Sequence, residues 1–284
     1  MKAIKNIVAV FIAAFFVNSC DYVRSAQQTF TIKKPGDRKI LIEDYTGHKC
    51  GNCPAAAREL HRLDSIYKGQ VIPIAVHAGF YAAVTTPQYP TNLKCQASTD
   101  YDNTFGNSAA GNPNGLVNRV GFGTAGFVEQ WSSWGSTASS FYQDSADFNI
   151  SITNTYNSSN NQLTTRVRCK ATHLKSGTFN LVVLLTEDSI VAEQIDYGAN
   201  PQYSSSYLFN HVLRGAVNSS WGDPILTAGT FLKNDSIVKI YSNFQLSSTW
   251  KYKHCKVVAY VYDADGSSAK HYEVLQVESK DVYP

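Results

Sequence analysis

The feature that most constrains the fold of this chain is a pair of cysteines at the junction of two regular segments. An apolar run that begins at Ile40 leads to Cys50 and Cys53, and a helical pattern continues to Leu63. This order predicts a strand, a tight turn and a helix. The first turn of a helix presents unpaired N–H groups and a positive dipole end, which lower the pKa of a thiol placed there. We therefore expect Cys50 to be the reactive cysteine and Cys53 to be its resolving disulfide partner.

Two other uses of this cysteine turn stay open. A structural zinc site needs four ligands, and the later cysteines, Cys95, Cys169 and Cys255, are isolated in the sequence. The sequence contains no second C-x-x-C and no H-x3-H pattern. A thiol pair is therefore favoured over a metal site, and we expect neither a metal nor a cofactor. The remaining alternative is an inert structural disulfide, and the role of Cys95 is left open.

The start of the chain reads as a targeting segment. Lys2 and Lys5 precede an apolar run from Ile7 to Val17, which is too short to span a bilayer. The run ends in a small residue followed by Cys20, as at a bacterial lipoprotein cleavage site. We predict that residues 1–20 are a lipoprotein signal peptide and that acyl chains on Cys20 anchor the protein to a membrane. The alternative is an ordinary secretory signal with an incidental cysteine.

The charge balance limits the kinds of partner. Cleavage before Cys20 removes two lysines and lowers the formal net charge from +3 to +1. A nearly neutral chain of this kind argues against nucleic acid as a partner. The mature length suits two domains better than one.

The first domain is expected at residues 29–145, after a short tether at 21–28. Residues 39–45 and 71–77 read as buried strands around a helix at 54–68, and such a β-α-β unit makes the two strands parallel. The following stretch, 78–106, includes a loop rich in Tyr and Pro and a short helix. A later helical pattern places Phe127, Trp131, Trp134, Ala138 and Phe141 on one face, which is usually a core face.

The hydrophobic period changes to two near Ala146, which predicts a second domain over 146–284. Six alternating segments suggest an antiparallel sandwich of immunoglobulin type: 148–152, 163–171, 179–185, 237–244, 257–262 and 272–277. Cys169 and Cys255 both have the parity of core positions, so they could form a bridge between the sheets. Their places late and early in their strands would separate them if the strands run parallel. A helical turn is expected at 207–214.

Two stretches resemble the thioredoxin superfamily. The segment ILIEDYTGHKCGNC is similar to the strand and redox turn of that fold, and GNPNGLV resembles the segment in which a cis-proline faces the cysteines. The resemblance implies that Asp44 is the buried acid that assists proton transfer and that Pro113 shapes the substrate groove. It also implies a cis bond before Pro113. This turn departs from thioredoxin, because Lys49 stands before the first cysteine and Gly-Asn replaces Gly-Pro.

Three longer motifs, TGHKCGNCPAAA, GNPNGLVNR and YLFNHVLRGAVNSSWGD, are similar to the Omp28-related outer-membrane lipoproteins of the Bacteroidetes. That resemblance implies an outer-membrane location, either periplasmic or surface-exposed. Exported or outer-membrane proteins are then the expected partners. His48, Lys49 and Asn112 flank the predicted site and are expected to contact a substrate.

Two hypotheses of function follow. In one, the chain is an α/β thioredoxin-like scaffold followed by an immunoglobulin-like sandwich, and it binds a partner or surface while Cys50 and Cys53 form a structural bridge. In the other, it is a thiol-disulfide oxidoreductase or redox chaperone, in which Cys50 attacks and Cys53 resolves. The first is slightly favoured. The substrate, the redox direction and the oligomeric state do not follow from the sequence.

Overall fold

A β-α-β unit forms where the sequence predicts it. The computed structural model describes residues 36–121 and 126–283. Strand β1 (Ile40–Thr46) and strand β2 (Val71–His77) pair in parallel, and helix α2 (Cys53–Tyr67) connects them. The predicted signal peptide, Cys20 and the tether at 21–28 lie outside the described residues.

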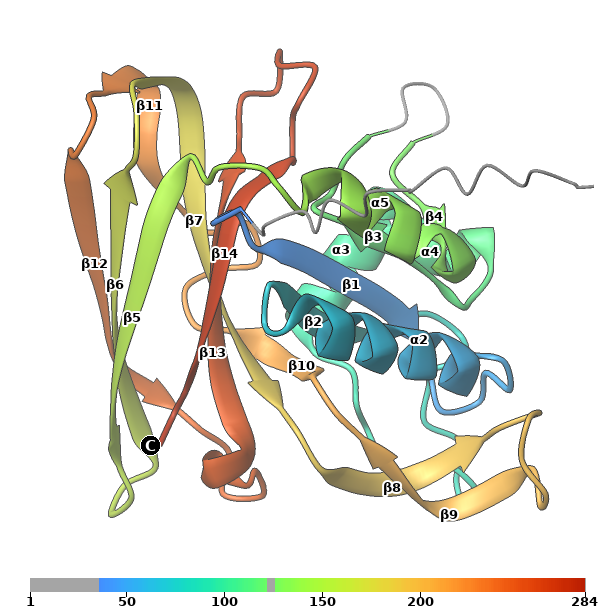
Figure 1. Cartoon of the computed structure of the whole chain (residues 1–284). Helices are drawn as coiled ribbons and strands as arrows, with labels where there is room; N and C mark the ends of the chain where they lie inside the picture. The colour runs from blue at the N-terminus through green and yellow to red at the C-terminus, as the bar shows by residue number, and fades with distance from the viewer. Residues whose placement is uncertain (1–35, 122–125, 284) are drawn as a thin grey trace, which may run out of the picture. The chain divides into compact units, whose positions relative to one another are not determined.

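Strands from both halves of the chain join one nine-stranded sheet (Figure 1). Its order is β14-β13-β7-β10-β2-β1-β3-β4, and β11 pairs with β7. The strands not yet given bounds are β3 (Asn114–Val117), β4 (Glu129–Gln130), β7 (Lys175–Glu187), β10 (Val212–Ala216), β11 (Asp223–Phe231), β13 (Cys255–Asp263) and β14 (Val274–Asp281). Strand β10 makes the junction, because Val212 pairs in parallel with Ala75 of β2 while the same strand runs antiparallel to β7.

The two faces of β7 bury different cores, as alternation along a strand requires. Leu181 and Val183 point into a core shared with a separate three-stranded sheet. Val182 and Leu184 point the other way, into a core shared with β1, β2 and helix α3 (Gln96–Phe105). The strands of the separate sheet are β5 (Phe148–Asn157), β6 (Gln162–Ala171) and β12 (Ser236–Gln245), in the order β12-β6-β5. All six predicted strands after residue 146 are confirmed.

The predicted aromatic face is partly confirmed. Helix α5 (Trp134–Phe141) buries Trp134 and Ala138 against β1 and α2, after a 3-10 turn at Trp131–Ser133. Phe127 lies outside this helix and packs instead with Phe105 and Tyr272, whose rings are 5.2 and 5.9 Å away. The sequence pattern predicts a longer helix than the structure has, because the spacing of aromatic residues alone does not mark where a helix begins. A four-residue helix, α4 (Asn107–Ala110), completes this part.

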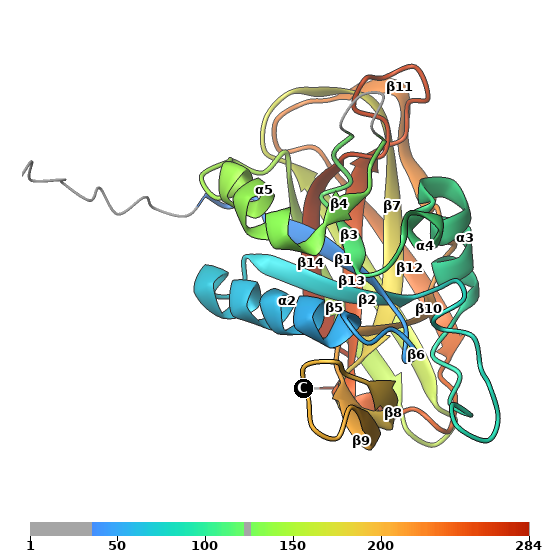
Figure 2. The same ribbon diagram turned by 90° about the vertical axis from the view of Figure 1, so that its right-hand side faces the viewer.

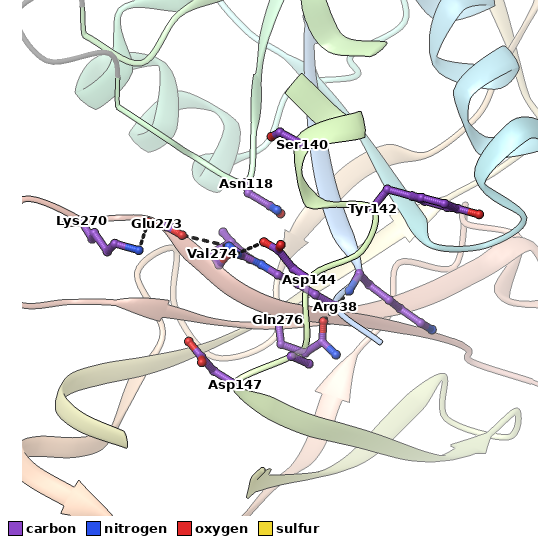
Figure 3. Close-up of polar contacts among 12 residues, drawn as sticks. Arg38, Asn118, Ser140, Tyr142, Asp144, Asp147, Lys270, Glu273, Val274 and Gln276 are labelled. Atoms are coloured by element: carbon purple, nitrogen blue, oxygen red, sulfur yellow. Dashed lines mark hydrogen bonds and ion pairs between the residues drawn. The ribbon is translucent and has the colours of Figure 1, made fainter. Parts of the chain in front are cut away.

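Arg38 connects the start of the described chain to both the middle and the end (Figure 3). Its guanidinium donates to Asp144 Oδ2 at 3.3 Å, to Glu273 Oε1 at 3.0 Å and to the Val274 carbonyl at 2.8 Å. The described residues belong to one compact unit that is not divided at Ala146. Separate folding of 29–145 and 146–284 therefore stays a prediction, and the shared sheet and this ion-pair cluster weigh against it.

One prediction for the second half is wrong, and one open alternative is decided. The predicted helical turn at 207–214 is instead the end of strand β9 (Tyr203–Phe209) and most of β10. Cys169 and Cys255 are free thiols rather than a bridge. Cys169 lies near Phe148, whose ring contacts that of Phe179. Phe179 pairs with the last residue of β13, whereas Cys255 is the first residue of that strand. The two thiols therefore lie at opposite ends of the same core.

Candidate functional site

Cys50 and Cys53 form a disulfide at the start of α2, with their Cα atoms 5.4 Å apart. The turn closes through hydrogen bonds from Cys50 N to the Gly47 carbonyl (2.9 Å) and from Cys53 N to the Cys50 carbonyl (3.2 Å). Helix α2 begins at Cys53, and Asn52 is its N-cap. The expectation that Cys50 lies in the first helical turn is therefore wrong by three residues. Cys53 has that position, because Pro54, which lacks a backbone N–H, is best tolerated at the helix start.

A hairpin from the second half of the chain covers this turn. Strands β8 (Ile190–Ile195) and β9 form a two-stranded ribbon that lies beside the N-terminal end of α2 in both views (Figures 1 and 2). Ile195 N donates to the His48 carbonyl at 3.0 Å, and Tyr197 N donates to the Gly51 carbonyl at 2.8 Å. Gln194 Nε2 donates to the Cys50 carbonyl at 3.0 Å. Cys50 and Cys53 are consequently only 3% and 2% exposed.

The first of the two residues between the cysteines, Gly51, fits the hairpin closely. The ring of Tyr197 lies directly against Gly51, so a Cβ added there would be 2.5 Å from three ring atoms. Such a separation is far inside van der Waals contact, and the ring and the turn could not both keep their places. Glycine is thus needed at this position for the close approach of the hairpin.

Asp44 is a buried acid beside the disulfide. It is 2% exposed, and its Oδ1 has no hydrogen-bond partner in the described protein. Burial raises the pKa of Asp44 from 3.8 to about 8, so the carboxyl is largely protonated at neutral pH. Asp44 and Cys53 line the same cavity of about 200 Å³ between α2, the sheet and the hairpin. The predicted role of Asp44 in proton transfer to the cysteine pair stays a prediction.

His77, the last residue of β2, lines the same cavity. It is fully buried, and neither ring nitrogen has a hydrogen-bond partner in the described protein. Burial, with a further contribution from His48, lowers its pKa to about 3, so the ring is neutral. Phe209 of the hairpin packs edge-on against it at 5.4 Å. His61 of α2 also lines this cavity and is exposed to solvent.

The bond before Pro113 is cis, which confirms that prediction. In the antiparallel pairing of β1 and β3, Gly115 lies opposite Asp44 and Asn114 lies opposite Tyr45. Pro113 comes just before Asn114 in the sequence, so it lies beside the C-terminal end of β1, where the cysteine turn begins. Pro113 does not line the cavity that holds Cys53. The side-chain oxygen and nitrogen of Asn112 are buried without partners in the described protein.

His48 and Lys49 both contact the loop after β2. The His48 ring stacks on Tyr89 at 5.2 Å, and its Nε2 lies 3.2 Å from the Ala83 carbonyl. Burial lowers the pKa of His48. Lys49 Nζ donates to Thr85 Oγ1 at 3.2 Å and lies over the Phe80 ring at 4.4 Å. Substrate contact by either residue stays a prediction.

The structure answers two further questions from the sequence. Cys95 is the N-cap of α3, where its sulfur accepts a hydrogen bond from Ser98 N at 3.4 Å. Within residues 36–121 and 126–283, no three His, Cys, Asp or Glu side chains gather as a metal site would require. The helices of these residues include none with the length and apolar character needed to cross a membrane. Gln194 and Tyr197 are not predictable from the sequence as site residues. Gln194 acts through its side-chain amide and Tyr197 chiefly through its backbone N–H, and no short motif marks either group.

Comparisons with known proteins place the chain in a family. The model of the outer membrane protein Omp28 matches residues 98–284. HBP35 of Porphyromonas gingivalis has a similar structure, with a TM-score of 0.63, 19% identity, and coverage of 88% of this chain and 77% of that one. A solved protein of Agrobacterium tumefaciens has a TM-score of 0.52 at 13% identity, with coverage of 86% and 95%. These identities show a shared fold alone. No curated protein matches the chain. The family match confirms the resemblance carried by the sequence motifs, and the chain belongs to the Omp28 family of outer membrane proteins.

Proposed function

We propose that this protein is a lipid-anchored outer-membrane protein that binds a partner or surface, and that Cys50–Cys53 is a structural bridge in its closed form. Residues 29–145 then act as a thioredoxin-like scaffold and residues 146–284 as an immunoglobulin-like sandwich. The β-α-β unit, the antiparallel β3 and the cis bond before Pro113 support the first assignment. The packing of the three-stranded sheet on β7 and β13 supports the second.

One observation carries the choice of a structural bridge. A catalytic disulfide must meet an attacking thiolate in line with its S–S bond, and a pair that is 3% and 2% exposed offers no such approach. The hairpin that covers the pair is held to the turn by three hydrogen bonds. A disulfide sequestered in this way is stabilised against exchange.

The reduction potential of the Cys50–Cys53 pair tests this proposal. We expect a value below about −300 mV, as for structural disulfides, when the protein is equilibrated with dithiothreitol buffers and the reduced fraction is measured by alkylation and mass spectrometry. The double variant Cys50→Ser, Cys53→Ser should still fold, and it should keep the proposed binding of a partner or surface. A potential between about −270 and −120 mV, the range of catalytic pairs, would contradict the structural role.

A thiol-disulfide oxidoreductase is the second candidate, and Asp44 is the observation that favours it. A substrate thiolate would attack Cys50 Sγ and break the S–S bond, and the departing Cys53 thiolate would take a proton from the neutral Asp44 carboxyl. A second substrate thiolate would then attack the mixed disulfide, leaving an oxidised substrate and two reduced cysteines. The raised pKa of Asp44, about 8, suits a group that holds and releases a proton near neutral pH. Exported or outer-membrane proteins would be the substrates.

The anchor has its own test. Replacing Cys20 with Ser removes the predicted acylation site, and no other segment of the sequence is apolar for long enough to hold the chain in a membrane. We expect the variant to move from the membrane fraction to the soluble fraction. Asn18→Gln, two residues before the cysteine, is the control and should stay with the membrane. Unchanged membrane association of Cys20→Ser would refute the lipid anchor.

A further inference from the structure

The hairpin β8–β9 is separate from the sheets that hold the molecule together. Its two strands pair only with each other among the described residues, and neither joins the nine-stranded or the three-stranded sheet. It projects from the end of β7 and returns into β10 (Figure 1). The hairpin could therefore move without breaking a hydrogen bond of either sheet.

Both connections of the hairpin contain a backbone conformation that is rare for residues other than glycine. Ser189 and His211 are non-glycine residues with positive φ, 60° and 59°, at the entry and exit of the hairpin. Few residues adopt this region, and a change in it alters the chain direction sharply. The two connections are tied to each other, because His211 N donates to Asp188 Oδ1 at 2.7 Å and Ser189 N donates to Asn210 Oδ1 at 3.0 Å. These two hydrogen bonds hold the entry and the exit of the hairpin together.

Only a small set of contacts holds the hairpin over the cysteines. Besides the three hydrogen bonds to the turn, Asp196 pairs with Arg58 at 2.9 Å, and the Arg58 side chain is 58% exposed. An ion pair so open to water contributes little. The Tyr203 hydroxyl donates to the Gln88 carbonyl at 3.1 Å. Two aromatic contacts add to these polar ones, because the Tyr197 ring lies against Gly51 and the Tyr203 ring lies 5.9 Å from that of Tyr89. The base of the hairpin is fixed by Ala192 and Phe209, which pack with Leu93 and Val212. The part that can leave the turn is therefore the tip beyond this base, residues 193–206.

We propose that the β8–β9 hairpin is a gate over the Cys50–Cys53 disulfide. Closed, its N–H groups occupy the carbonyls of His48 and Gly51, to which an extended polypeptide would otherwise donate. Open, it frees those carbonyls and exposes Cys50 Sγ to a thiol. The inference deepens the proposed function, because it states what keeps the bridge structural and what event would make it reactive. The partner that fits the open turn is an extended polypeptide carrying a thiol.

The rate of disulfide reduction tests the gate. Dithiothreitol reduces the pair when its thiolate attacks Cys50 Sγ, the Cys53 thiolate leaves and the second dithiothreitol sulfur closes an oxidised ring. Residues 193–206 can be replaced by Asn-Gly, a favoured two-residue hairpin turn, because Ala192 and Tyr207 face each other across the ribbon. This change removes Gln194, Tyr197 and Tyr203 but keeps the base. We expect the full chain with this shortened hairpin, in detergent, to be reduced at least tenfold faster than the wild type.

Two further variants sharpen the test. Gln194→Ala, which removes one hydrogen bond to the turn, should accelerate reduction severalfold. Val191→Ser lies on the hairpin but is 56% exposed and touches neither the turn nor the cavity, so it should leave the rate unchanged. The buried thiols of Cys169 and Cys255 report the fold, because they should stay unreactive in every variant that remains folded.

The outcomes separate the gate from the proposed function. Equal reduction rates for the wild type and a folded shortened variant, whether fast or slow, would overturn the gate. If the shortened variant exposes Cys169, it is not folded, and the test is then the reduction rate of Gln194→Ala compared with that of Val191→Ser. Equal rates for these two variants would also overturn the gate. The equilibrium reduction potential of the wild type decides the structural role independently, since a gate changes the rate of access.

Discussion

Replacing Asp44 with Asn should make the protein more stable at neutral pH, and the increase should grow with pH. The folded protein holds the Asp44 proton up to about pH 8, whereas the unfolded chain releases it near pH 3.8. Between these values the unfolded state binds fewer protons, so the free energy of unfolding falls as pH rises. The amide introduced by Asp44→Asn carries no titrating proton, so the variant does not suffer this loss.

The magnitude follows from the two pKa values. Each pH unit within the window costs about 1.4 kcal/mol, so the whole window would cost at most about 6 kcal/mol. From pH 5 to pH 7 the stability of Asp44→Asn relative to the wild type should rise by about 3 kcal/mol. The comparison between two pH values cancels any constant cost of burying the introduced amide.

Urea denaturation at pH 5, 6 and 7 measures this difference on the oxidised protein. Asp265→Asn is the matched control, because hydrogen bonds from Ser267 lower the pKa of this exposed carboxyl. Its carboxylate is ionised in both states throughout the range, so its difference from the wild type should not change with pH. A pH-independent difference for Asp44→Asn would refute the assignment of Asp44 as a buried, protonated acid.

Three shorter predictions concern the fold. Glu43→Gln should lower the free energy of unfolding by about 3–5 kcal/mol in urea, because it leaves the fully buried Arg119 guanidinium without its carboxylate; an unchanged midpoint would contradict this. Cys169 and Cys255 should react with Ellman's reagent only in denaturant, and labelling of the folded protein would speak against their burial. Arg38→Ala should cost about 1–3 kcal/mol in the same urea assay, since it leaves Glu273 half-satisfied; full stability would show the cluster to be dispensable.

Elements with a strong local pattern were predictable from the sequence. Strands β5 and β6 alternate apolar and polar residues because one face of each is buried. Strand β2 is a nearly continuous apolar run, and β1 begins with three apolar residues, because both faces of these strands are buried. Helix α2 was predicted within one residue at each end. The β8–β9 hairpin was not predicted, because β9 has the sequence YSSSYLF, a serine-rich segment with no regular alternation of apolar and polar residues.

The candidate site divides in the same way. Asp44, Cys53 and the cis bond before Pro113 could be predicted because side-chain chemistry and a proline mark them in the sequence. The hairpin that covers the turn could not be predicted, because Ile195 and Tyr197 act through backbone N–H groups that nearly every residue has. The close fit at Gly51 depends on a ring almost 150 residues away, which no local pattern can indicate.

The family match covers much of what surrounds the cysteine turn, but not the turn itself. That match, residues 98–284, includes the hairpin, Pro113 and Arg119, but not the cysteine turn. The hairpin caps the turn, and β3 pairs with β1, the strand that leads into it. Elsewhere in the core, Arg119 of the matched part neutralises Glu43 of β1. A segment that supplies the cover, the neighbouring strand and the buried counter-charge constrains what the cysteines can do more than the cysteines' own sequence does. In the proposed gate, the hairpin of the matched part decides when the cysteine pair can react.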